Sequence, residues 1–388
     1  MADTSRGRIA YIAESVAGTT PDNPDFQILR FTSSGLAYTK QTTESNELES
    51  GAMITDLIET GAESGGNLDV EWSPDSYDDL IEAAVRGTRT TAVASVAGDA
   101  AITASGGTAT VTDTGKFANA TVGQWLLFRG WTNSVNNGWK QVATNADNDT
   151  ITIEDANMVA ESAGGSGQID GQMIRNGTVE RSFSLEETYT DIDVFRLFKG
   201  QRVGMMSADF SAGSILTGSM SFMGLDVEIE DSDPPSWLGT GSRTTATTTG
   251  ILNATANVGG IYVDGTLSTA CFKSLSLSIE NQLRPTQCIG SKFPGLVGYG
   301  RQRVSGSLTK VFNSIALYEA MLNHSDVSLA FGAYNTSGGI HFSLPRVKLG
   351  NDSVGLSGGN DTDVDESIDW TAIKDTTGTY QIQVDIAS

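Results

Sequence analysis

One alternating pattern recurs along this chain and limits the folds that it can adopt. Leu275, Leu277 and Ile279 alternate with serines, and a second alternating segment spans residues 304–312 after a long stretch punctuated by glycine and proline. A period of two predicts strands with one buried face, and the connecting stretch is too long for a tight hairpin. A short helical pattern follows at residues 315–322. The segment therefore predicts a module of strand, long loop, strand and short helix.

The same module occurs earlier in the chain. Residues 216–220 (LTGSM) align with residues 304–308 (VSGSL), and this alignment also brings residues 185–187 close to residues 279–281. A weaker echo at residues 66–72, followed by a helical segment, matches residues 306–308 and the helix after them. We therefore expect a duplicated β architecture.

The composition agrees with this expectation. Thr, Ser, Gly, Asn and Val are plentiful, only 8 of 388 residues are proline, and no long amphipathic helix is visible. These features predict an all-β chain with one or two short helices, built as a duplicated β-sandwich or barrel. A chain of this length can bury a large core.

The chain is strongly acidic. It has 24 Lys and Arg against 47 Asp and Glu, which gives a formal charge of −23. Proteins that grip DNA or RNA neutralise phosphates with cations, so this balance argues against such a role. A like-charged wall can, however, keep a polyanion close without holding it.

Targeting signals are not apparent. The first residues, MADTSRGRIAYIAE, contain no apolar segment typical of a signal peptide, and no apolar run approaches the roughly 20 residues that span a bilayer. The two cysteines, Cys271 and Cys288, are expected to be reduced, partly buried thiols. We expect synthesis in a cytoplasm and no membrane partner.

Changes in composition divide the chain into three parts. Residues 1–87 are expected to form the first part of a β body, with an extended arm over residues 1–30 and a short capped helix that ends at Arg86. Residues 88–176 contain several short strands and are expected to form a small Ig-like or SH3-like β domain inserted into a surface loop. Residues 177–388 continue the β body.

No motif points to catalysis or to a cofactor. The chain has only two histidines, His324 and His341, so catalytic triads and most zinc sites lack their usual residues. Asp361, Asp363 and Asp365 resemble the start of a calcium loop, but Ala372 stands where the bidentate glutamate belongs, so we interpret them as a solvated acidic loop. We predict no catalytic, cofactor-binding or metal-binding residue, and no enzyme activity.

Acidic side chains gather in one polar segment. Residues 41–62 contain five acids and no arginine, with Lys40 just before them, and the simplest interpretation is a solvated acidic loop. Three further acids fall within the repeated modules. These eight acids, which we consider as candidates for functional positions, are Glu44, Glu47, Glu49, Asp56, Glu59, Glu186, Glu187 and Glu280.

The order of several short phrases resembles a known family, the major tail tube proteins of bacteriophages with long, non-contractile tails. No phrase is specific alone, but together they cover nearly the whole chain. They are residues 66–71 with 77–80, residues 122–133 with 136–138, residues 276–283 with 304–308, residues 342–345 and residues 369–372.

This resemblance implies a fold and a role. Members of the family form hexameric rings that stack into a tube around a tape-measure protein, between an initiator or baseplate and a terminator protein, and DNA later passes through the lumen. The eight acids are then candidates for inter-ring or lumen positions. Residues 44–63, residues 285–300 and the N-terminal arm are candidates for inter-ring contacts, and the inserted domain is expected on the outer surface. The resemblance implies a virion protein made in the cytoplasm of a bacterial host.

Two alternatives remain open from the residues. Another virion β protein, such as a capsid decoration or baseplate component, would form discrete particles and not open tubes. A carbohydrate-binding or carbohydrate-hydrolysing β protein would need an aromatic cleft, yet Trp125, Trp131 and Trp139 cluster in the insertion and are more typical of a small core.

Overall fold

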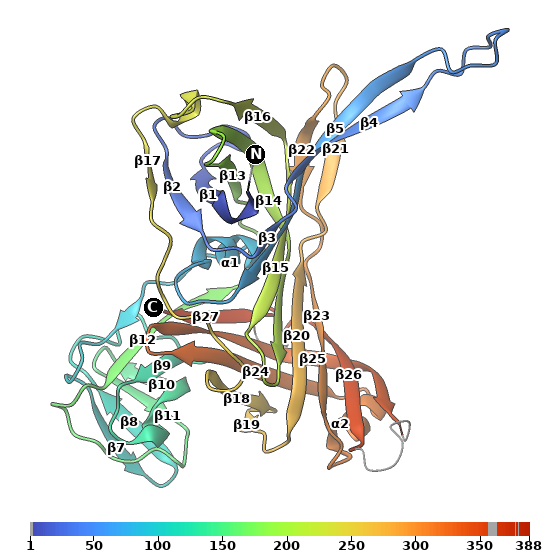
Figure 1. The fold of residues 1–388 in the computed structure, drawn as a ribbon. Coiled ribbons are helices and arrows are strands. Elements are labelled where there is room, and N and C mark those ends of the chain that lie inside the picture. Colours follow the sequence, from blue (N-terminus) through green and yellow to red (C-terminus); the bar gives the residue numbers. More distant parts are fainter. Residues whose placement is uncertain (1–2, 356–362, 377, 379) are drawn as a thin grey trace.

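The computed structural model describes residues 3–355, 363–376, 378 and 380–388 (Figure 1). Strands dominate these residues, and the prediction of an all-β chain with one or two short helices is confirmed. The described helical segments are α1 (Asp78–Val85), α2 (Ala316–Leu322) and three 3-10 turns, η1 (Thr4–Arg6), η2 (Ser134–Asn136) and η3 (Ser236–Leu238).

Six antiparallel neighbours form the central sheet. In spatial order they are β5 (Leu57–Glu71), β15 (Thr217–Gly224), β14 (Val194–Ser211), β20 (Phe272–Glu280), β23 (Arg303–Val311) and β26 (Asp365–Ala372). β14, β15, β20 and β23 run through the tall part of the molecule in Figure 1, and β26 continues the sheet at its lower right.

The register of this sheet shows the duplication. Ala208 pairs with Leu277 at its centre, where β14 meets β20. Met206 pairs with Met220 on one side as Leu275 pairs with Leu308 on the other. Residues 216–220 and 304–308 thus occupy matching places around β15 and β23, as the alignment predicts. The weaker match of residues 66–72 to residues 306–308 is not reproduced by the sheet. Residues 66–71 belong to β5, which lies beside β15, and the equivalent place beside β23 is taken by β26.

Glycines allow two tryptophans to lie against this sheet. A Cβ on Gly218 would come within 2.4 Å of the Trp72 indole nitrogen, and one on Gly306 within 2.4 Å of the Trp370 ring. Both indoles are buried among the apolar side chains of the sheet's inner face. The glycines shared by the two aligned segments therefore have a packing role.

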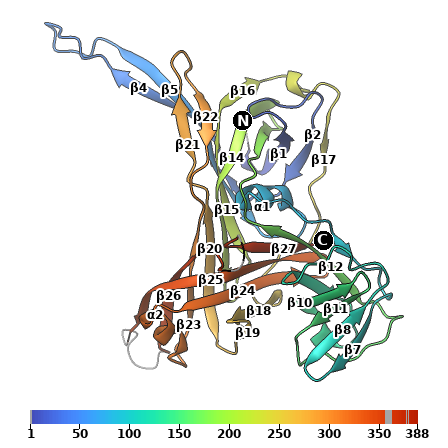
Figure 2. The same ribbon diagram turned by 180° about the vertical axis from the view of Figure 1, so that it is seen from behind.

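Further strands cover the inner face of the sheet at its two ends (Figures 1 and 2). The upper group contains β1 (Gly7–Glu14), β2 (Asp25–Leu29), β13 (Ser182–Tyr189), β16 (Asp226–Glu230) and β17 (Ser242–Thr244), joined to the first part of β14. The lower group contains β18 (Val258–Val263), β19 (Thr266–Leu267), β24 (Asp326–Asn335), β25 (Gly338–Val354) and β27 (Gln383–Ala387).

The N-terminal residues do not form the extended arm that the sequence suggested. β1 pairs with β13 along its whole length, and Ile9 and Ala10 are fully buried. The capping expected for α1 also differs. Ser76 makes no cap; its hydroxyl is shared with Ser73 at 2.7 Å, and Tyr77 precedes the helix without a side-chain cap.

Residues 93–169 contain a hydrophobic cluster of their own. The strands here are β6 (Val93–Ala94), β7 (Ala101–Ser105), β8 (Thr108–Thr112), β9 (Trp125–Arg129), β10 (Gly138–Asp147), β11 (Thr150–Ile153) and β12 (Gln168–Arg175). They form the lobe at the lower end of the molecule (Figure 2). The boundaries at residues 88 and 176 stay a prediction.

An aromatic contact joins this lobe to the body. His341 on β25 stacks on Trp125 with ring centroids 4.2 Å apart, and Trp139 lies 5.4 Å from the same imidazole. Burial lowers the pKa of His341 to about 3, so the imidazole is neutral at pH 7. All three tryptophans are buried, but only Trp131 lies in the lobe's own cluster, as the sequence predicts. Trp125 and Trp139 instead pack against Ala330 and Ala387 of the body.

Two hairpins project beyond the upper group (Figure 1). One consists of β4 (Ala37–Glu44) and the first half of β5, with the short β3 (Ser33–Ser34) beside its base. The other consists of β21 (Arg284–Gln287) and β22 (Pro294–Gly298). Residues 41–62 and 285–300, which the sequence suggested were loops, are therefore largely hairpins.

The glycine–tryptophan packing gives a stability prediction. Gly306→Ala should destabilise the fold by about 1–3 kcal/mol, because the added methyl would lie 2.0 Å from the Ser276 carbonyl oxygen and 2.4 Å from the Trp370 ring. Gly165→Ala is the control, since a Cβ there meets nothing within 4 Å. Urea unfolding followed by tryptophan fluorescence measures both, and equal midpoints for the two variants would contradict the packing argument.

Candidate functional site

The face of the central sheet opposite the core is polar across all six strands. One row of cross-strand partners runs through Asp369, Ser307, Ser276, Asp209, Thr217 and Glu71. A neighbouring row contains Thr371, Ser305, Ser278, Ser207, Ser219 and Asp69. Every one of these side chains is half-buried or exposed. We call these two rows the open polar face.

Short hydroxyl side chains and carboxylates make up this face. Ser276 and Ser307 share a hydrogen bond of 3.0 Å, and Ser219 N–H donates to the Ser207 hydroxyl at 3.0 Å. Four acids, Asp69, Glu71, Asp209 and Asp369, lie in the two rows, and no Lys or Arg does. Burial raises the pKa of Asp209 above its usual value.

Among the described residues, cations stand next to these two rows: Lys348 on β25 is the cross-strand partner of Thr371. Arg303 faces Glu280 at the end of the β20–β23 pair, and Lys273 is bound to Asp365 at 2.7 Å. A surface of hydroxyls and carboxylates without cations offers a phosphate chain no neutralising partner. It can therefore border a polyanion without binding it.

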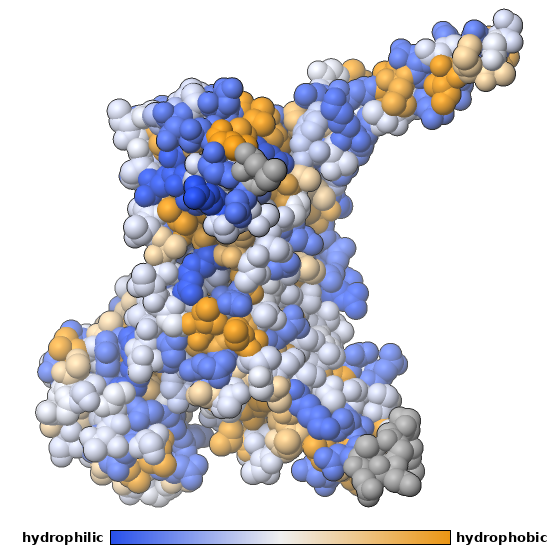
Figure 3. All heavy atoms as spheres, in the orientation of Figure 1, coloured by the Kyte–Doolittle hydropathy of each residue, from blue (hydrophilic) through white to orange (hydrophobic). Residues whose placement is uncertain are grey.

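The β4–β5 hairpin presents a different surface. Glu44, Glu47, Glu49, Asp56 and Glu59 are all exposed on it. Its apolar side chains are exposed as well: Leu48, Met53, Ile54, Leu57 and Ile58. Figure 3 shows this mixture of apolar and polar residues along the hairpin. Contiguous exposed apolar groups rimmed by polar ones are typical of a surface that binds another protein.

The second hairpin supports the base of the first. Ala62 N–H donates to the Lys292 carbonyl at 2.7 Å, and the Tyr38 and Phe293 rings lie 5.7 Å apart. Tyr38 also donates to Glu59 at 2.9 Å, which lowers the pKa of that carboxyl. The base is thus held in place, while residues 45–56 extend past these contacts.

Two of the eight candidate acids lie in the interior. Glu186 is 0% exposed and accepts two hydrogen bonds from Arg243, at 2.5 and 2.8 Å, and one from Trp237 at 3.0 Å. Glu187 is nearly buried and binds Arg196 at 2.8 Å. These carboxylates hold the upper group together and are not free surface charges.

The last candidate, Glu280, lies at the end of β20 and accepts from the Gln282 amide at 2.8 Å. The structure thus brings the five hairpin acids together and separates the other three from them. The sequence analysis did not identify Asp209 and Asp369 as acids of the open polar face. The alternating serines at residues 274–278 were the signal in the sequence that one face of these strands is polar.

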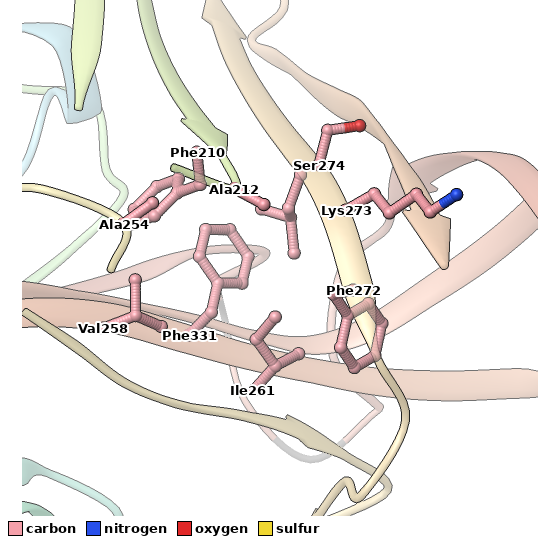
Figure 4. Close-up of a pocket in the computed structure, with 10 residues that line it drawn as sticks. Phe210, Ala212, Ala254, Val258, Ile261, Phe272, Lys273, Ser274 and Phe331 are labelled. Atoms are coloured by element: carbon pink, nitrogen blue, oxygen red, sulfur yellow. The ribbon is translucent and has the colours of Figure 1, made fainter. Parts of the chain in front are cut away.

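The described residues show few features of a catalytic or metal-binding site. A cavity of about 90 Å³ is lined by apolar side chains, including Phe210, Ile261 and Phe331, which point toward one another while the Lys273 ammonium points away (Figure 4). Among the described residues, no group of three or more His, Cys, Asp or Glu could hold a metal ion. Asp361 of the acidic loop lies outside the described residues. Cys271 and Cys288 are free, but both are exposed, so the prediction of partly buried thiols is wrong.

No helix among the described residues is long and apolar enough to cross a membrane. An all-β body with an exposed hairpin of mixed apolar and acidic side chains, and with a sheet face of hydroxyls and carboxylates, has a surface suited to contacts with other proteins. The family comparison agrees: the model for phage tail tube proteins matches residues 4–372, and the chain belongs to that family. No curated protein matches the chain.

Membership makes the chain a structural component of a virion tail that assembles with itself into a tube.

The buried ion pair gives a prediction that separates interior acids from surface ones. Glu186→Gln should destabilise the subunit by about 3–5 kcal/mol, because it leaves the Arg243 guanidinium buried and without its carboxylate. Glu44→Gln, at an exposed position, should change stability by less than about 0.5 kcal/mol. Chemical denaturation of the monomers measures the difference, and similar stabilities would show that Glu186 is not a structural acid.

Proposed function

We propose that this chain forms stacked hexameric rings in a long, non-contractile phage tail, around a tape-measure protein, and that DNA later travels through the lumen. An initiator or baseplate complex binds one end of the tube and a terminator protein the other. The subunit is made in the cytoplasm of the bacterial host and has no catalytic role.

The observation that carries this proposal is the open polar face. In a ring, the central sheets of neighbouring subunits line the lumen with this face inward, and their inner faces remain packed on the subunit cores. Lateral closure of such sheets removes free strand edges.

The charge of this face suits the passage of DNA. Asp69, Glu71, Asp209 and Asp369 repeat around each ring and repel phosphates, while the serines and threonines keep the wall hydrated. A wall of lysines and arginines would instead neutralise the phosphates, release the counterions condensed on the DNA, and hold the DNA. Glu280 lies at the border of this lining.

The hairpins make the contacts between rings. Glu44, Glu47, Glu49, Asp56 and Glu59, with their apolar neighbours, lie on a segment that extends past its own subunit and reaches the next ring. Head-to-tail contacts of this kind do not close on themselves and so produce a filament. The lobe of residues 88–176 is a domain inserted into the body of residues 1–87 and 177–388, and it decorates the outside.

Charge reversal on the open polar face tests the lumen assignment. Tubes of Asp209→Lys/Asp369→Lys subunits should form normally, but DNA ejection from particles that carry them should slow by roughly ten-fold or more, because each lysine binds phosphate. Glu154→Lys, an exposed acid of the inserted lobe, should leave ejection unchanged.

Two measurements check this expectation. Electron microscopy of the purified protein reports hollow striated tubes, and dye fluorescence reports DNA release. Unchanged release from particles with the double lysine variant would remove this face from the lumen. Discrete particles in place of tubes, from the unmodified protein with its initiator present, would overturn the tube itself.

A further inference from the structure

Three cations gather in one groove of this acidic chain. Arg301, Arg303 and Lys374 line an open groove of about 680 Å³, together with Ala372 and Ile373. None of the described residues that line it carries a carboxylate. The groove lies where β23 begins and β26 ends, at the margin of the open polar face, and Thr371 of the second row is one of its lining residues.

The local backbone turns these cations outward. Gln302 points inward, where its amide donates to the Ala84 carbonyl at 2.9 Å and to Asn281 at 3.2 Å. In an extended segment successive side chains alternate in direction, so Arg301 and Arg303 project to the other side. Both are exposed, as is Lys374.

These charges form no ion pair among the described residues, although Glu280 is the cross-strand partner of Arg303. Most other lysines and arginines of the chain are bound to carboxylates, as in the Arg181–Glu82 and Arg346–Asp326 pairs at 2.8 and 2.7 Å. Across the described ranges, Arg301, Arg303 and Lys374 form no ion pair. An unpaired basic cluster on a chain of charge −23 is complementary to an acidic surface.

The tip of the β4–β5 hairpin is such a surface. Residues 44–56 carry Glu44, Glu47, Glu49 and Asp56 and no cation, and their apolar side chains include Leu48 at 103% exposure and Ile54 at 63%. The tip points away from its own body (Figure 1), so it cannot fill its own groove. Acidic and apolar groups on the tip match the cations and the Ala372–Ile373 floor of the groove.

We propose that this groove receives the acidic hairpin tip of a second copy of the chain. The inference rests on the proposed tube, for which it names the receiving site of the ring-to-ring contact. Ion pairs from Arg301, Arg303 and Lys374 to the tip carboxylates orient the two subunits, and Leu48 and Ile54 bury their apolar surface against Ile373.

DNA is the less suitable occupant. Three cations in a groove surrounded by a strongly negative surface neutralise few phosphates, and nucleic-acid affinity grows with that number. The hairpin tip brings a comparable number of carboxylates together with apolar surface that DNA lacks.

Reversed charges test the contact. The groove-reversed variant, Arg301→Glu/Arg303→Glu, and the hairpin-reversed variant, Glu47→Lys/Glu49→Lys, should each form tubes at least ten-fold more slowly than the unmodified chain, because like charges then face each other. Lys116→Glu on the inserted lobe is the control and should assemble normally. Circular dichroism and thermal melting confirm that all variants fold, and light scattering with electron microscopy follows assembly.

Mixing the two reversed variants is the decisive step. Each variant supplies the surface that the other lacks, so an equimolar mixture should form tubes, as should a single chain that carries all four substitutions. Failure of both, with folded variants, would overturn the hairpin-to-groove contact.

The remaining outcomes are also informative. Normal assembly of the groove-reversed variant with altered DNA passage would assign the groove to DNA and overturn the proposal. Failure of the unmodified chain to form tubes would instead count against the proposed function, so the two failures are distinguishable.

Discussion

The pairing of β14 with β20 is the contact on which the rest of the structure depends. It joins the two halves of the duplication through seven consecutive residue pairs, from Met205–Glu280 to Ser211–Ser274. A slip of one residue would exchange the faces of every side chain on one half. Leu275, Leu277 and Ile279 would then lie in solvent, and the serines would enter the core. The continuity of the polar face across six strands therefore follows from this one register.

The central sheet and the β4–β5 hairpin present two different kinds of surface. On the sheet, each polar residue has an apolar neighbour along the strand that packs inward, so its free face can be wholly hydrophilic. On the hairpin, β4 and the first half of β5 have no second layer, and apolar and acidic side chains share both faces. The acids keep such a segment soluble while it is unpartnered. An association that neutralises those charges also removes the apolar groups from water.

Several features could be predicted from the sequence because their signals are local. Period-two alternation located β20 and β23, a shared glycine revealed the duplication, and a helical pattern located α2. Glu186 could not be assigned, because its partners Trp237 and Arg243 lie more than fifty residues further on. The burial of residues 7–14 depends on pairing with β13, roughly 175 residues away. The β4–β5 hairpin was missed because its strands lack a buried face and so lack alternation.

The projection of the hairpin from one pole of the subunit gives the assembled tube a direction. If the hairpin tips of one ring fill the grooves of the next, free tips remain at one end of a growing tube and empty grooves at the other, so the two ends are chemically different. A protein that starts the tube needs to imitate only one of these surfaces, and a protein that stops it needs to cover only the other. Length control then becomes a matter of which end is left uncapped, without any change in the subunit itself.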